Sequence, residues 1–230
     1  MMVLGIVLIG ATLYSCQATT SSEQAFFLDI TAPQTGDEYA TTMIGVSDKL
    51  KSATGVTVKL AFKVVGVPRI LTIISVTRVC SMRALELQLE SLKVIVTAKE
   101  LYDIMDLATD LSLPSTHIAL AKAKRPKTLT GEYIYFGESN FITKDLDNAA
   151  FQTLLQRHIK KSLELQIAGI KFINYNVLGE SPMQLLTFAA LPPRHLQKTV
   201  WQEDRVNIFR APSMTRVVPL EDYLKENYCN

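Results

Sequence analysis

The chain has 230 residues, of which 48% are apolar and 20% are charged, and its formal net charge is +2. This composition is typical of a globular protein and excludes a largely disordered one. A net charge so close to zero gives no overall field that would favour nucleic acid or an acidic membrane surface as a partner.

The N-terminal segment is the strongest local signal. Residues 1–14 carry no charge, and the first charged residue of the chain is Glu23. Such a run is shorter than the roughly 20 residues that span a bilayer, and it is typical of a secretory signal peptide. We predict a signal peptide over residues 1–18, cleaved after Ala18, and a secreted, extracellular protein with no membrane contact after cleavage. Because no Lys or Arg precedes the apolar run, an uncleaved anchor, an apolar strand and a lipoprotein signal remain alternatives.

Three cysteines bear on redox state and metal binding. Cleavage would remove Cys16 and leave Cys80 and Cys229, which could form a disulfide in an oxidising compartment. The alternative is a buried Cys80 and a free thiol near the C-terminus. The sequence has neither a Cys-x-x-Cys motif nor a cluster of His and Cys, so we expect no metal site.

The first half of the mature chain, residues 25–106, predicts the element order β-α-β-β-α-β. The alternation of apolar and polar residues, the helical spacing of apolar residues and the glycine turns support this order. The predicted elements are a strand at 26–31, a helix from Asp37 that ends at Gly55, strands at 56–65 and 69–76, a helix from Ser81 and a strand at 93–98.

The second half, residues 131–226, predicts the same order. Its elements are a strand at 132–139, a helix that begins after Asp145 or Asp147 and ends at Gly169, strands at 170–178 and 183–191, a helix from Pro192 and a strand at 205–210. Residues 107–130, with Pro114, Pro126 and a basic cluster, are predicted to link the halves. Gly55 and Gly169 lie 114 residues apart, and the two hairpin turns lie 113 apart, so the pattern favours a duplicated domain.

A β-α-β-β-α-β unit of this length is the ferredoxin-like arrangement. In element order alone, two such units resemble the dimeric α/β-barrel superfamily, which includes muconolactone isomerase-like proteins. The resemblance implies an α+β fold in which two ferredoxin-like units pack sheet to sheet as a pseudo-dimeric α/β barrel. A ligand would then lie between the sheets.

Alternation along the strands predicts which side chains line that space. It directs the apolar residues of 56–64 toward the helices, and it directs Lys59, Lys63 and Asp29 into the space between the sheets, where Asp29 would balance a buried lysine charge. Tyr175 and His195 complete the candidate lining. The alternative is that both lysines lie on an open face and reach water.

No known catalytic or cofactor-binding motif occurs: the sequence lacks G-x-S-x-G, H-E-x-x-H, P-loop and G-x-G-x-x-G patterns. We therefore expect a secreted, non-catalytic extracellular or matrix-associated protein with no cofactor and an unknown extracellular partner. The alternative is a small-molecule-binding protein, or an isomerase- or monooxygenase-like enzyme, that uses the cavity between the two sheets.

Overall fold

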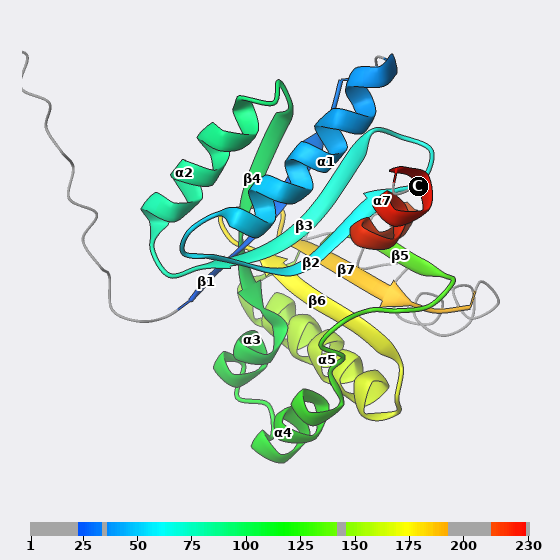
Figure 1. The fold of residues 1–230 in the computed structure, drawn as a ribbon. Coiled ribbons are helices and arrows are strands. Elements are labelled where there is room, and N and C mark those ends of the chain that lie inside the picture. The colour runs from blue at the N-terminus through cyan, green and yellow to red at the C-terminus, as the bar shows by residue number, and fades with distance from the viewer. Residues whose placement is uncertain (1–22, 34–35, 142–145, 193–212, 229–230) are drawn as a thin grey trace, which may run out of the picture.

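The strands of both halves close into one antiparallel barrel with helices outside it (Figure 1). The computed structural model describes residues 23–33, 36–141, 146–192 and 213–228. The strands are β1 (Gln24–Thr31), β2 (Val56–Val64), β3 (Arg69–Val76), β4 (Ile95–Asp103), β5 (Ile134–Asn140), β6 (Lys171–Val177), β7 (Gln184–Ala190) and β8 (Ser213–Pro219). The helices are α1 (Gly36–Ser52), α2 (Val79–Glu90), α3 (Ile104–Asp110), α4 (Ser115–Lys124), α5 (Asn148–Ile167) and α7 (Leu220–Tyr228).

The order of the strands around the barrel is β1-β3-β2-β8-β5-β7-β6-β4. The first half supplies β4-β1-β3-β2 and the second half supplies β8-β5-β7-β6, so the strands of each half stand in the order fourth, first, third, second. The halves join where β2 pairs with β8 and β4 pairs with β6, over three residue pairs at each junction. The prediction of an α+β fold whose strands form a barrel is therefore confirmed.

Aromatic side chains fill the interior of the barrel. The Phe27 ring stacks on the Phe136 ring with centroids 5.5 Å apart, and the Phe188 ring lies 4.9 Å from Phe136 and 5.3 Å from Phe62. All four residues are at most 2% exposed. Because protein interiors are close-packed, this cluster joins the two halves through a common core and occupies the space where we had predicted a ligand.

A β-bulge in β2 changes which side chains face that core. The register of β2 against β3 shifts between Val58 and Leu60, so the strand holds one extra residue there. Beyond the bulge, Leu60 and Phe62 belong to the barrel core, and Lys63 lies on the outer, helix-covered side. The prediction that alternate residues of 56–64 all face the helices was therefore wrong beyond Val58, because strict alternation does not survive an inserted residue.

The helices cover the outside of the barrel in two groups, with α1, α2 and α7 over the first half and α3, α4 and α5 over the second (Figure 1). Residues 107–130, predicted as a linker, contain the end of α3 and all of α4. Ala108 and Ala121 of these helices are fully buried against the α5 face, so this segment is part of the packed structure.

Three predictions about the chain ends and the last elements fall on residues that the structure does not describe. These are the signal peptide at 1–18, the helix from Pro192 and the strand at 205–210. The strand that completes the second half in the described residues is β8, which continues directly into α7. Among the helices of the described ranges, none has the length and apolar character needed to cross a membrane.

Candidate functional site

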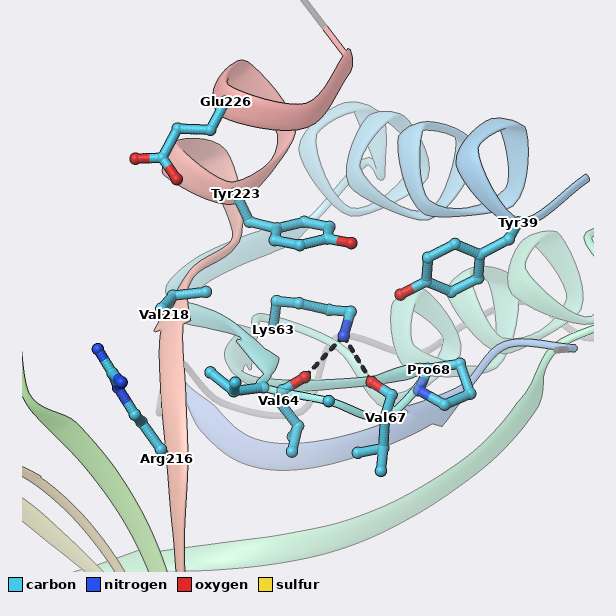
Figure 2. Close-up of a pocket in the computed structure, with 11 residues that line it drawn as sticks. Tyr39, Lys63, Val64, Val67, Pro68, Arg216, Val218, Tyr223 and Glu226 are labelled. Atoms are coloured by element: carbon cyan, nitrogen blue, oxygen red, sulfur yellow. Dashed lines mark hydrogen bonds between the residues drawn. The ribbon is translucent and has the colours of Figure 1, made fainter. Parts of the chain in front are cut away.

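Lys63 lies in a pocket of about 570 Å³ on the outer side of the barrel, between the start of α1, the turn after β2, and α7 (Figure 2). The β-bulge directs this lysine outward, and the pairing of β2 with β8 brings α7 over it. Apolar side chains from the turn and β8 form much of the wall: Val64, Val65, Val67, Pro68 and Val218. Residues more than 150 positions apart in the sequence therefore share one pocket.

The Lys63 amine is held by main-chain oxygens below it and by aromatic rings above it (Figure 2). Nζ donates hydrogen bonds to the carbonyl oxygens of Val64, at 2.6 Å, and Val67, at 2.5 Å. It also lies 5.1 Å from the centroid of the Tyr223 ring and 6.0 Å from that of Tyr39. These contacts fix the position of the nitrogen and leave its remaining bonding direction toward the two tyrosines.

Burial of the Lys63 amine determines the direction in which its pKa shifts. Lys63 is 3% exposed, and no ion pair joins it to a carboxylate among the described residues. Removal from water disfavours the ammonium form and lowers the pKa of Lys63, whereas the tyrosine faces favour a cation. Burial also raises the pKa of Tyr39 and Tyr223, so both phenols keep their protons at neutral pH. The pocket thus offers an amine that forms no ion pair with any described carboxylate, beside two hydroxyl groups.

The other charged residues predicted for the site bind elsewhere. Asp29 lies on the inward face of β1, as predicted, but it forms an ion pair with Arg69 through two hydrogen bonds of 2.8 and 2.6 Å. Asp29 therefore does not balance the charge of Lys63. Lys59 is exposed and pairs with Glu23 at 3.1 Å, which matches the solvated alternative for this lysine.

Tyr175 points into the barrel core and is 8% exposed, packed among apolar side chains. Burial raises the pKa of its phenol, and the Arg125 guanidinium lies 5.3 Å from its ring. His195 lies outside the described residues. Cys80 is disulfide-bonded, while Cys16 and Cys229 are outside the described residues, so pairing with Cys229 stays a prediction.

Sequence reasoning identified Lys63 but missed the residues around it. Neither Tyr39 nor Tyr223 was among the residues predicted to line a site. An acidic pair, Glu221 and Asp222, lies in the first turn of α7, as is common at a helix start. No local pattern shows that this helix packs over the first half of the chain, because that contact follows from the pairing of β8 with β2.

A second polar cluster lies on the buried side of α5. His158, Ser162 and Gln166 follow one another at intervals of four residues, and all are at most 7% exposed. Gln166 donates to the main-chain oxygen of Phe172 at 3.2 Å, and the His158 ring meets Phe141 edge-on at 5.6 Å. None of the three lines any of the four described pockets. This cluster is therefore packed in the described structure.

Comparison with known proteins gives structural neighbours only. No protein-family model and no curated protein matches the chain. Among solved structures, a mutant chlorite dismutase from Candidatus Nitrospira defluvii matches with a TM-score of 0.59 and 12% identity, over 90% of this chain and 96% of that chain. The same enzyme in complex with imidazole matches with a TM-score of 0.58 and 11% identity over the same shares. At these identities the likeness shows the fold alone, which this chain shares with chlorite dismutase structures.

Another of these neighbours is a mutant in complex with cyanide. A metal ion or a haem is held in a protein by side chains such as His, Cys, Asp and Glu, and the described residues can be compared with that requirement. They contain no group of three or more His, Cys, Asp or Glu suited to a metal. A haem needs an axial ligand beside a cavity, and neither His117 nor His158 lines a described pocket. The linings of the four pockets described for this part of the chain thus contain no histidine.

The comparison corrects the expected function. The solved neighbours carry the name of an enzyme, so the chain shares its fold with enzymes. The prediction of a non-catalytic, matrix-associated protein was wrong, because the solved structures that share this fold are those of an enzyme. Secretion stays a prediction. The alternative, a small-molecule-binding or enzymatic protein, fits better. Its predicted location between the sheets does not fit, because phenylalanine rings fill that space.

Proposed function

We propose that this protein binds a small organic acid in the Lys63 pocket, in a fold that enzymes also use. The observation that carries the proposal is the buried amine of Lys63, which has no carboxylate partner among the described residues. A buried ammonium without a countercharge is costly, and an incoming carboxylate would supply that charge. Binding and neutralisation would then occur in one step.

The shape and chemistry of the walls support an acid with an apolar body. Val65, Val67 and Val218 present aliphatic surface beside the amine. The protonated phenols of Tyr39 and Tyr223 can donate to a second carboxylate oxygen. At about 570 Å³, the pocket lies within the range usual for small-molecule sites. A monocyclic aromatic acid is therefore a suitable probe.

The experiment is isothermal titration calorimetry of the full chain with benzoate, with benzyl alcohol as the uncharged analogue. We expect benzoate to bind at least tenfold more tightly, because a hydrogen bond to a charged group is worth roughly 1.5–3 kcal/mol. Since a bound carboxylate raises the pKa of Lys63, binding should take up protons. Titrations in buffers of different ionisation enthalpy, at alkaline pH, measure that uptake.

The matched variants are Lys63→Met and Lys59→Met. Both remove one lysine from β2, but Lys59 is exposed and already paired with Glu23. Lys63→Met should lose the preference for benzoate and the proton uptake, whereas Lys59→Met should keep both. Equal benzoate affinity in wild type and Lys63→Met would overturn the proposal.

We also propose that the two halves are ferredoxin-like units that arose by duplication, as the element order of muconolactone isomerase-like proteins suggested. The same order of strands in both halves supports this history, as does the helix-ending glycine at equivalent places. A search for chains that carry one half only, with significant similarity to both halves of this chain, tests it. Relatives of one half that resemble only that half would count against it.

A further inference from the structure

The hydrogen bonds of Lys63 account for two N–H groups. A neutral primary amine has two N–H groups and one lone pair, so the carbonyl oxygens of Val64 and Val67 satisfy all of its hydrogens. In Figure 2 both bonds leave Nζ on the side of the turn, away from the Tyr223 ring. In the neutral state, the lone pair is therefore the group left to meet a ligand.

We propose that Lys63 also acts as a nucleophile, and that its nitrogen forms an imine with small aldehydes or ketones that enter the pocket. This inference rests on the pocket of the proposed function, but it uses the neutral amine where acid binding uses the ammonium. It adds a covalent ligand class to the site.

The reaction balances without any other reactant. The Nζ lone pair forms a bond to the carbonyl carbon, and the carbonyl oxygen takes up a proton to give a carbinolamine. Nζ gives up both of its hydrogens in the course of the reaction, the oxygen leaves with two hydrogens as water, and a C=N bond to Nζ remains. A protonated phenol such as Tyr39 or Tyr223 can donate the proton to the oxygen. The net change is amine plus carbonyl to imine plus water, with no oxidation or reduction.

The surroundings of Lys63 separate it from the surface lysines. The titratable groups that line its pocket are Tyr39 from α1, Tyr223 and Glu226 from α7, and Arg216 from β8, and none forms an ion pair with it. Lys59, by contrast, is exposed and forms an ion pair with Glu23. Burial lowers the pKa of Lys63, so a larger fraction of its amine is neutral.

The test is reductive trapping of the full chain with benzaldehyde and cyanoborohydride at near-neutral pH, followed by peptide mass spectrometry. We expect Lys63 to be labelled first and faster than Lys59, because burial lowers the pKa of Lys63 and so raises the fraction of its amine that is neutral. Lys63→Arg keeps a cation in place but removes the reactive amine, and it should lose the early label. Benzoate should slow labelling of Lys63 and leave Lys59 unaffected.

The outcomes separate the two proposals. Labelling of exposed lysines with Lys63 unlabelled would overturn the imine, and if benzoate still binds through Lys63, the proposed acid site stands. Early labelling of Lys63 in a protein that does not bind benzoate would support the nucleophile and overturn the acid site.

Discussion

Replacing Phe136 by alanine should destabilise the protein strongly and leave the Lys63 pocket intact. Phe136 is 2% exposed, and its ring lies between those of Phe27 and Phe188, with centroids 5.5 and 4.9 Å away. Truncation of a buried Phe to Ala costs about 3–5 kcal/mol. The upper part of this range applies here, because the closed ring of strands limits collapse around the cavity. For a chain of this size the loss lowers Tm by roughly 6–20 °C.

Urea denaturation followed by circular dichroism measures this loss, with Tyr135→Ala as the control. Tyr135 is the neighbouring aromatic residue of β5 and points out of the barrel, so its removal should cost only about 1 kcal/mol. Benzoate affinity should not change in Phe136→Ala. A variant that loses less than about 1 kcal/mol but no longer binds benzoate would refute the reasoning, because the barrel interior would then be the ligand site.

Two further predictions concern a glycine and a tyrosine. Gly55→Ala should lower the free energy of unfolding by about 2–3 kcal/mol, because Gly55 has φ +73° and an added Cβ would lie 2.6 Å from Ser81 Oγ. Gly169 has φ +91°, and an added Cβ there would meet no atom within 4 Å. Gly169→Ala should therefore lower the free energy of unfolding by less in the same denaturation assay. Tyr102 donates a hydrogen bond to Asp110, which raises the pKa of Tyr102 to about 12. Asp110→Asn should return the pKa of Tyr102 toward 10, which ultraviolet titration would show. Between pH 10 and 12 the wild type should lose stability relative to this variant, because Tyr102 stays protonated in the folded wild type but loses its proton in the unfolded chain. An unchanged titration curve would show that the hydrogen bond is absent in solution.

The strands were the most predictable part of the fold. Five of residues 69–76 are apolar, and β3 occupies the same eight residues, of which all but Arg69 are buried. The two first helices of the halves were also predicted, since helical spacing of apolar residues and a following glycine mark them. Local patterns determine these elements because burial of one face sets the period of the sequence.

The sequence-based predictions that were wrong or incomplete concern places where distant parts of the chain meet. The segment 107–130 was interpreted as a linker because Pro114 and Pro126 interrupt it, yet Pro114 immediately precedes α4, where a proline is tolerated. The bulge at Lys59 reversed the faces of β2, and no residue type there marks it. The tyrosines around Lys63 come from helices at both ends of the chain, so only the closed order of strands brings them together.

The two junctions between the halves have a consequence for fragments of this protein. If residues of one half were produced alone, the outermost strands of that half would present unpaired N–H and C=O groups at both borders. Since both halves arrange their strands in one order, a second copy of the same fragment could satisfy those groups and rebuild a ring. A fragment would then assemble only above some threshold concentration. The single polypeptide avoids this dependence on dilution, because each half always has its counterpart attached.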